Sequence, residues 1–225
     1  MSERDLVVFD LDGTLVDSAP DLAAAVDAAL AEGGLPEPGE QRVRGWIGGG
    51  ARLMLARALA WAGAADTEAA VADLYPVFYE RYSAHVAERS RPYAGTEAML
   101  ETLARSGMTL AVATNKPERL ARLLLAELDL AGRFAAIVGG DTTEAKKPSP
   151  APLLAVCRSV GAEPRKGAMV GDAVVDLRAA RAAGMSGLAA GWGYGRRGDL
   201  EAERPDALLA APAAIPGALA PASWI

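Results

Sequence analysis

The chain has 225 residues, of which 51% are hydrophobic and 23% charged, and its formal net charge at pH 7 is −6. This length suffices for one buried core, or for a core with a small accessory domain, and the composition is typical of a folded globular protein. A nucleic-acid surface needs clustered cations and a membrane span needs a long apolar run, so we expect a protein that binds neither nucleic acid nor membrane.

The first predicted strand ends in two acidic residues. Residues 1–5 are charged and lead directly into the apolar run Val7–Phe9, which predicts a cytoplasmic protein without a signal peptide. The run is β-branched or aromatic and predicts a buried strand with Asp10 at its carboxyl end. In an extended chain Asp10 and Asp12 project to the same side, where their charges repel unless a cation, a shared proton or solvent offsets them. The segment therefore indicates either a ligand site or an acidic turn.

The following part of the chain, residues 16–90, is predicted to be wholly helical. An alanine-rich helix over residues 21–32 ends at the glycine- and proline-rich segment 33–38. Residues 51–62 and 67–89 lack the alternation that is typical of strands. We expect this block to form a helical unit inserted into the rest of the chain.

From Pro92 onward, predicted helices alternate with short β-rich runs. The helices span 96–106, 117–128, 150–160 and 174–183, and the strands span 109–114, 135–138, 167–170 and 188–190. This alternation predicts a parallel sheet covered by helices on both faces. The expected fold class is α/β, with a doubly wound, Rossmann-like core formed by residues 1–15 and 91–225 and an all-helical cap domain at 16–90. The Ala/Pro-rich tail, residues 210–222, has no readable chemistry.

Two polar clusters follow predicted strands, where open parallel sheets assemble their ligand sites. Thr114 and Asn115 offer a hydroxyl and backbone N–H groups to phosphate oxygens, with a helix cap as the structural alternative for Thr114. Lys147 precedes Pro148, which disfavours helix at the lysine and sets it on an extended approach to the next helix. A solvated loop lysine is the alternative there.

The last cluster is Gly171-Asp172 with Asp176. Asp172 follows a predicted strand and Asp176 lies one helical turn later, so both side chains could face one point. Acidic residues in a first helical turn also suit the helix dipole, which is the alternative explanation.

The chemistry-bearing residues favour phosphoryl transfer. The single histidine, His85, lies in a polar helical stretch and has no second histidine with which to share a metal, so zinc chemistry and a Ser-His-Asp triad are disfavoured. The single cysteine, Cys157, lies on an apolar helix face and predicts a buried structural thiol. Carboxylates, a hydroxyl and a lysine suit Mg²⁺-dependent chemistry on a small-molecule phosphate ester, because Mg²⁺ and Lys147 would offset the repulsion between a phosphate dianion and an attacking carboxylate.

These clusters resemble, in order, the four motifs of the haloacid dehalogenase-like hydrolase superfamily. Asp10-Leu11-Asp12-Gly13-Thr14 resembles the first motif, Thr114-Asn115 the second, Lys147-Pro148 the third, and Gly171-Asp172 with Asp176 the fourth. The resemblance covers essentially the whole chain, and its implied helical cap, inserted after the first motif, corresponds to residues 16–90.

The resemblance implies a role for each acidic residue of the first and fourth motifs. Asp10 would attack phosphorus to form an aspartyl-phosphate, while Asp12 would protonate the leaving alcohol and then activate the hydrolytic water. Mg²⁺ would be bound by the carboxylates of Asp10 and Asp172 and by the backbone carbonyl of Asp12.

It also implies how the phosphoryl group is held. Thr114, Asn115 and Lys147 would bind the transferring group. Asp176 would orient Lys147 or the waters bound to the metal, without binding the metal itself.

Substrate choice is expected in the cap. In the segment 46–52, Gly49 and Gly50 would present backbone N–H groups to an anion and Arg52 would bind a carboxylate, with a flexible turn as the alternative. This segment, together with 146–153 and 191–195, most resembles the phosphoglycolate phosphatase branch, although Ala173 stands where that branch often has serine. The resemblance implies hydrolysis of 2-phosphoglycolate to glycolate and phosphate by a monomer or homodimer. The alternatives are a phosphosugar mutase and a phosphatase for another substrate, such as a sugar phosphate or pyrophosphate.

Overall fold

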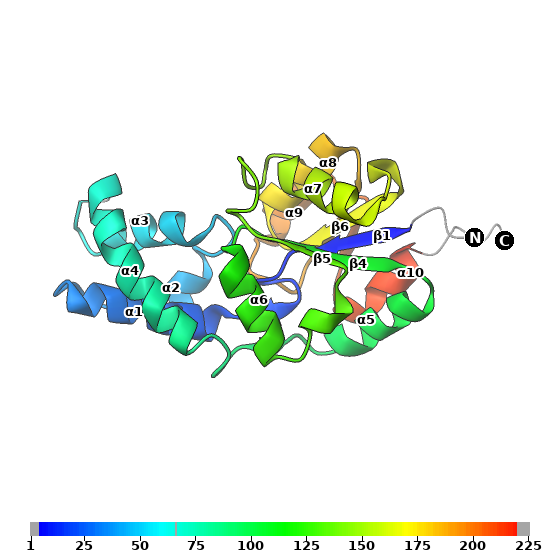
Figure 1. Ribbon diagram of the computed structural model, residues 1–225. Helices are drawn as coiled ribbons and strands as arrows, with labels where there is room; N and C mark the ends of the chain where they lie inside the picture. Colours follow the sequence, from blue (N-terminus) through cyan, green and yellow to red (C-terminus); the bar gives the residue numbers. More distant parts are fainter. Residues whose placement is uncertain (1–4, 66, 220–225) are drawn as a thin grey trace.

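The computed structural model describes residues 5–65 and 67–219. The larger of its two parts is built around a six-stranded parallel sheet (Figure 1). The strands of this sheet are β1 (Leu6–Phe9), β4 (Thr109–Ala113), β5 (Ala136–Val138), β6 (Gly167–Gly171), β7 (Ser186–Ala190) and β8 (Ala207–Leu209). The predictions made for residues 1–4 and for the tail at 220–222 lie outside the described residues.

The sheet is doubly wound about β1. Its strand order is β5-β4-β1-β6-β7-β8, so the chain builds one half through β4 and β5 and then crosses β1 to build the other half. Val8 of β1 pairs with Ala111 on one side and with Met169 on the other. The crossover creates a switch point at the carboxyl end of β1, where sheets of this kind bind their ligands. The predicted α/β fold class is confirmed.

Helices cover both faces of the sheet because its strands are apolar on both sides. Leu6 and Val8 of β1 pack against one layer, and Val7 and Phe9 pack against the other. The first layer contains α7 (Ala151–Val160) and α8 (Val174–Ala183), and the second contains α5 (Thr96–Arg105), α6 (Glu118–Glu127) and α10 (Ile215–Leu219) (Figure 1). Cys157 is buried in the first layer, as predicted.

The helices of the inserted segment pack on one another beside the carboxyl ends of the strands (Figure 1, left). They are α1 (Ala19–Glu32), α2 (Glu40–Arg44), α3 (Ala51–Trp61) and α4 (Glu68–Ala84). The prediction that residues 16–90 are wholly helical was wrong at the start of this range. There β2 (Val16–Asp17) pairs antiparallel with β3 (Arg91–Pro92), a long-range pairing that local periodicity cannot reveal.

The two segments that connect the inserted helices to the sheet are held together by a buried carboxylate. Asp21, in the first turn of α1, accepts hydrogen bonds from the backbone N–H of Arg89 and Ser90 at 2.7–3.1 Å. The Ser90 hydroxyl donates to the same carboxylate at 2.6 Å. The segment that returns to the sheet is therefore fixed against the helix that leaves it.

The last part of the chain contains structure that the sequence patterns did not predict. A helix, α9 (Arg197–Ala202), precedes β8, which extends the sheet by pairing with β7. No element was predicted in the tail, where Ile215 and Leu219 of α10 are buried in the core. Short 3-10 helices lie at Ala131–Arg133, Pro164–Lys166 and Pro212–Ala214.

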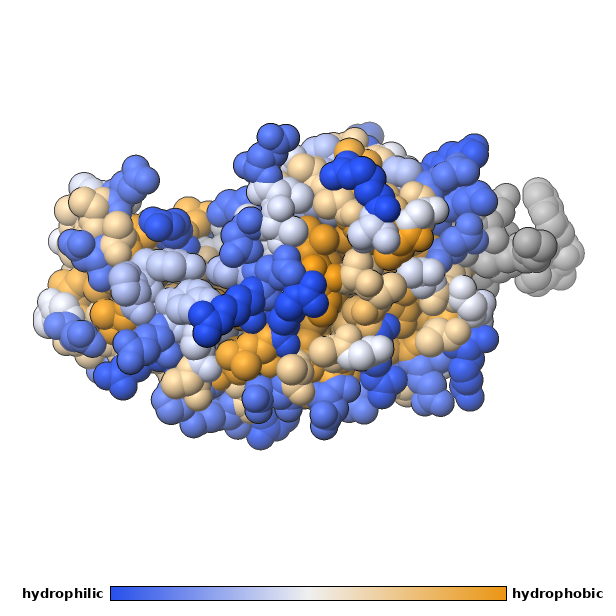
Figure 2. Space-filling view, in the orientation of Figure 1, coloured by the Kyte–Doolittle hydropathy of each residue, from blue (hydrophilic) through white to orange (hydrophobic). Residues whose placement is uncertain are grey.

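Figure 2 shows a hydrophilic patch over part of α6, with hydrophobic side chains directly beside it. Arg119 and Arg122 are exposed cations of this helix.

His85 is also exposed and lies 2.7 Å from Glu88, which agrees with its interpretation as a surface residue. Across residues 5–65 and 67–219, no helix combines the length and apolar character needed to cross a membrane.

Candidate active site

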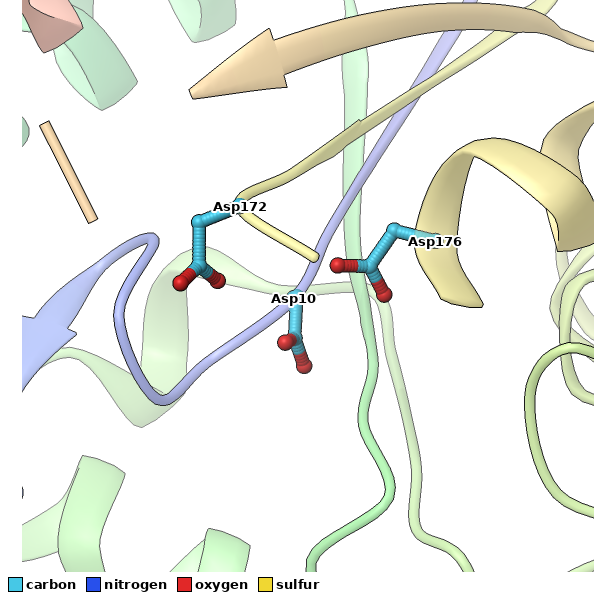
Figure 3. A group of neighbouring side chains, drawn as sticks. All are labelled: Asp10, Asp172 and Asp176. Atoms are coloured by element: carbon cyan, nitrogen blue, oxygen red, sulfur yellow. The ribbon is translucent and has the colours of Figure 1, made fainter. Parts of the chain in front are cut away.

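Three buried carboxylates meet at the carboxyl end of the sheet (Figure 3). Asp10 follows β1, Asp172 follows β6, and Asp176 lies in the first turn of α8. One carboxylate oxygen from each lies within 4.8 Å of the other two. The structure thus brings together residues that are more than 160 positions apart in the chain, because parallel strands present their carboxyl ends at one edge.

Lys147 lies among these carboxylates. Its Nζ is 2.9 Å from Oδ1 of Asp10 and 2.7 Å from Oδ1 of Asp176, and it donates a hydrogen bond to the Ala113 carbonyl at 2.7 Å. The lysine is only 1% exposed. The alternative of a solvated loop lysine is therefore wrong, since this ammonium group is held between two carboxylates and the end of β4.

The cluster buries more negative than positive charge. Burial raises the pKa of Asp172 to about 8, and the charges of Asp10 and Asp176 add to the shift. Burial also raises the pKa of Asp10, to about 6, against the opposing effect of Lys147. Burial lowers the pKa of Lys147, but the two carboxylates outweigh it and leave this pKa above its usual value. A divalent cation would relieve the surplus, and hard carboxylate ligands suit Mg²⁺, so the residues present fit this metal.

The oxygens of Asp176 are both engaged. Oδ1 faces the ammonium group of Lys147, and Oδ2 accepts a hydrogen bond from the backbone N–H of Ala173 at 3.0 Å. This arrangement supports the expected role of Asp176 in orienting Lys147.

Asp172 is held in place by the loops around it. Its Oδ1 accepts a hydrogen bond from the Thr14 hydroxyl at 3.0 Å, and its Oδ2 accepts one from the backbone N–H of Tyr194 at 2.8 Å. Gly13 has φ +88°, and a Cβ at this position would lie 2.4 Å from Oδ2 of Asp172. Only glycine allows the first loop to approach this carboxylate so closely.

Asp12 makes a separate set of contacts. Its carboxylate accepts a hydrogen bond from the Ser18 hydroxyl at 2.5 Å and is paired with Nζ of Lys116 at 2.9 and 3.0 Å. Lys116 is buried, and its Nζ lies 4.4 Å from the centre of the Tyr82 ring, within the range of a cation–π contact. Lys116 directly follows Thr114-Asn115, but no local sequence pattern indicates its role, because its partner is 104 positions away.

Thr114 and Asn115 begin the loop after β4, and both are buried. The Thr114 hydroxyl oxygen accepts a hydrogen bond from the backbone N–H of Lys116 at 3.2 Å, which leaves its proton to be donated to a ligand. The Asn115 amide donates to the carbonyls of Lys147 and Gly48, both at 3.0 Å. Asn115 therefore holds the Lys147 loop and also joins the inserted helices to the sheet.

A cavity lies between the inserted helices and the ends of the strands. It offers about 30 Å³ to the centres of water-sized molecules, which is room for about two waters. Its polar wall is formed by Asp10, Asp12, Thr114, Asn115 and Lys116, and its apolar wall includes Leu22, Ile47, Met54, Phe78, Tyr82 and Leu120. The polar cluster at the strand ends thus continues into a small pocket, and Lys116 is the one cationic residue among the described residues that line it.

The glycine segment of the cap contacts the sheet through its carbonyl groups. Gly48 accepts from Asn115, and Gly49 accepts from the exposed Lys146 at 2.6 Å. Gly50 lines the cavity, whereas Gly49 and Arg52 are not among its lining residues. Arg52 is exposed, and its guanidinium lies 5.0 Å from the centre of the Tyr75 ring. Anion binding by Gly49, Gly50 and Arg52 stays a prediction.

Tyr194 caps the helix that enters the inserted segment. The side chain of Ser18 forms no capping bond, and the Tyr194 hydroxyl instead accepts from the backbone N–H of Ser18 at 2.8 Å and of Ala19 at 3.0 Å. It also bonds to Oδ1 of Asp17 at 2.9 Å. Because the backbone N–H of Tyr194 holds Asp172, one residue of the loop after β7 links the carboxylate cluster to the start of α1.

Replacing Tyr194 with phenylalanine should destabilise the protein by about 1–3 kcal/mol, because two N–H groups at the start of α1 lose their acceptor. Urea unfolding followed by circular dichroism would measure this. Tyr79→Phe is a matched control, since Tyr79 is half-buried and contacts Tyr75 through its ring. Equal stabilities of the two variants would contradict the capping role.

Stabilisation by Mg²⁺ should be larger at pH 8 than at pH 6. Asp10 and Asp172 have pKa values raised from 3.8 to about 6 and about 8, so without metal the stability they contribute at low pH is lost as pH rises through these values. A bound cation favours the ionised carboxylates and restores the loss. Thermal unfolding in EDTA and in excess Mg²⁺ at both pH values tests this, and an equal shift at both would contradict it. In Asp172→Asn the difference between the two pH values should shrink.

Comparison with known proteins agrees with this geometry. Residues 4–184 match the family described as haloacid dehalogenase-like hydrolase. Phosphoglycolate phosphatase 1 of Pseudomonas aeruginosa is 44% identical over 210 residues, covering 91% of this chain and 75% of that protein. The phosphoglycolate phosphatase of Xanthomonas campestris is 43% identical over 220 residues, covering 97% and 96%.

A solved structure shows the same fold. The crystal structure of a predicted phosphoglycolate phosphatase from Haemophilus somnus superposes with a TM-score of 0.90 at 33% identity, covering 96% of this chain and 98% of that one. The family match, the extent of these alignments and the four motifs gathered at the strand ends confirm the resemblance predicted from the sequence. The chain belongs to the haloacid dehalogenase-like hydrolase family.

Proposed function

We propose that this hydrolase is a Mg²⁺-dependent phosphomonoesterase that converts 2-phosphoglycolate to glycolate and phosphate. The observation that carries the proposal is the buried cluster at the strand ends, in which Asp10, Asp172 and Asp176 surround one ammonium group. Carboxylates with a surplus of negative charge, next to a lysine and a threonine hydroxyl, suit the binding of a divalent cation and a phosphate dianion.

Asp10 acts as the nucleophile in this proposal. Its pKa of about 6 leaves it mostly ionised at neutral pH, as attack on phosphorus requires. Lys147 and Thr114 hold the phosphoryl oxygens, with Lys147 kept in place by Asp176 and by the Asn115 amide that binds its carbonyl. Mg²⁺, held by Asp10, Asp172 and the backbone carbonyl of Asp12, supplies charge neutralisation and alignment of the displacement when bound.

Asp12 is the acid and base of the reaction. It would donate a proton to the leaving alcohol oxygen and later take one from the water that hydrolyses the aspartyl-phosphate. The Ser18 hydroxyl and Lys116 hold its carboxylate from two sides, which restricts its orientation. Its position on the cavity wall is where the leaving group of a bound ester would lie.

The choice of 2-phosphoglycolate is supported by the cavity and by the relatives. The pocket next to Asp12 is small, at about 30 Å³, which favours a substrate with a small body beside its phosphate. The relatives from Pseudomonas aeruginosa and Xanthomonas campestris carry the name phosphoglycolate phosphatase over almost the whole length of this chain. We assign residues 16–90 as the cap that closes this pocket, on a core formed by residues 1–15 and 91–225.

Phosphate release from a substrate panel tests the proposal. Phosphoglycolate, sugar phosphates, nucleotides and pyrophosphate are compared with Mg²⁺ and with EDTA. We expect the highest kcat/KM for phosphoglycolate and loss of turnover in EDTA. Equal turnover of all substrates would contradict the substrate assignment but leave the phosphatase assignment standing.

The alternative of a phosphosugar mutase is separated by the same assay. A mutase returns the phosphoryl group to a sugar and needs a bisphosphate activator, whereas a phosphatase releases inorganic phosphate without one. Phosphate release in the absence of any bisphosphate therefore discriminates between the two. The proposal includes action in the cytoplasm as a monomer or homodimer, and light scattering during gel filtration checks the oligomeric state.

A further inference from the structure

One residue that lines the cavity beside Asp12 is a lysine, Lys116, which has no role on the phosphoryl group in the proposed reaction. Lys116 is 5% exposed and lines the cavity, with Nζ at 2.9 and 3.0 Å from the two oxygens of Asp12. Asp10 and Asp12 are the other charged residues of this lining. An ammonium group has three N–H donors, so Lys116 retains capacity for a further acceptor on the cavity side.

A second polar group in the same wall lacks a partner. The Tyr82 hydroxyl is buried and forms no hydrogen bond with any residue in the described ranges 5–65 and 67–219. The face of the Tyr82 ring packs against Nζ of Lys116 at 4.4 Å. A buried hydroxyl without a partner costs free energy, and this cost is offset when a ligand supplies an acceptor.

We infer that Lys116 and Tyr82 form the site that recognises the second anionic group of the substrate, a carboxylate separated from the phosphate ester oxygen by one methylene group. The inference rests on the proposed function and identifies specificity-determining residues for it. When the ester oxygen of the substrate lies beside Asp12, the substrate carboxylate would extend into the small cavity and meet the ammonium group of Lys116. The apolar wall around it would exclude water. The tyrosine hydroxyl would donate to the same carboxylate.

Two other cations near the site, Arg52 and Arg44, contact other groups. Arg52 is exposed and lies over the Tyr75 ring instead of lining this cavity. Arg44 lines a second cavity of about 320 Å³ beside Asp172, but its guanidinium is paired with Asp17 at 3.0 Å and with a neighbouring glutamate. Among the described residues that line the cavity beside Asp12, Lys116 is the one cation, so it is placed to bind a carboxylate there.

The test compares phosphoglycolate with ethyl phosphate, which has the same two-carbon body without the carboxylate. The measured quantity is the ratio of the two kcat/KM values. We expect Lys116→Met to lower this ratio by about 100-fold and Tyr82→Phe to lower it by about 10-fold. Lys116→Arg should restore much of the ratio because it keeps the charge, and inhibition by glycolate should weaken in Lys116→Met. Arg119→Met is the matched control, since Arg119 is an exposed cation two positions into α6.

The outcomes separate this inference from the proposed function. If wild-type enzyme shows no preference for phosphoglycolate, the proposed substrate fails, and a carboxylate site fails with it. If wild type prefers phosphoglycolate but Lys116→Met loses both substrates equally, Lys116 only positions Asp12 and the inference alone is overturned. A lowered ratio in Arg52→Ala together with an unchanged ratio in Lys116→Met would also overturn it, because the carboxylate would then bind at the cap helix.

Discussion

Replacing Asp10 with asparagine should reduce phosphoglycolate turnover by about 10⁴-fold or more, because the amide keeps the shape of the side chain but cannot attack phosphorus. Steady-state phosphate release measures this loss. Wild-type protein quenched in acid during turnover should yield a phosphorylated peptide containing Asp10, and the variant should not.

The variant is expected to remain folded. Asp10→Asn removes one negative charge from a cluster that already buries a surplus, so its unfolding temperature without metal should lie close to that of the wild type. Asp73→Asn makes the same chemical change at an exposed position of α4 and should leave activity unaffected. Intact turnover in Asp10→Asn would mean that water attacks phosphorus directly and that no aspartyl-phosphate forms.

Asp10, Thr114 and Asp172 could be predicted to lie at one edge of the sheet because each directly follows a strand. The apolar run before Asp10 and the strand before Asp172 marked both residues as strand-end carboxylates, and the topology then brought them together. The loop lysine Lys147 was more ambiguous, since its sequence context equally suits a solvated side chain. Its burial depends on the neighbouring strand β4 and on α8, which no local pattern specifies.

The contacts that connect distant segments could not be predicted in this way. Lys116 directly follows Thr114-Asn115 and Tyr194 lies in the segment 191–195, yet their partners Asp12 and Ser18 lie 104 and 176 positions away. Neither residue belongs to a periodic pattern that would mark it. The missing predictions thus concern polar side chains whose environment is made by tertiary packing.

The fold shows the same division between local and distant information. Helix α8 begins and ends at the predicted residues, Val174 and Ala183, because its apolar face repeats with helical spacing. The strand β8 is a half-buried edge strand of three residues, and its Ala-Leu-Leu sequence has no β-branched or aromatic residue to mark it as a strand. The pair β2 and β3 consists of two residues each, and its existence depends on the return of the chain after about 75 residues.

Replacing Lys147 with methionine should destabilise the metal-free protein by about 3–5 kcal/mol, because the change leaves buried carboxylates without their cation. Burial already raises the pKa of Asp10 and of Asp172, and loss of the ammonium group would raise that of Asp10 further. Carboxyl groups with raised pKa values stabilise the folded state at low pH and lose this contribution as pH rises through those values. The deficit relative to wild type should therefore be larger at pH 8 than at pH 5, as measured by urea unfolding in EDTA.

Lys146→Met provides the matched control, because the neighbouring lysine is exposed and donates to the Gly49 carbonyl instead of to the buried carboxylates. Its stability should stay within about 0.5 kcal/mol of wild type at both pH values. Excess Mg²⁺ should recover part of the stability of Lys147→Met, since a divalent cation offsets the charge of the same carboxylates. Turnover should remain about 10³-fold below wild type, because the phosphoryl oxygens lose a hydrogen-bond donor. If Lys147→Met were as stable as Lys146→Met at pH 8 in EDTA, Lys147 would not be the group that neutralises the buried carboxylates. Protons bound to these carboxylates would then neutralise them instead.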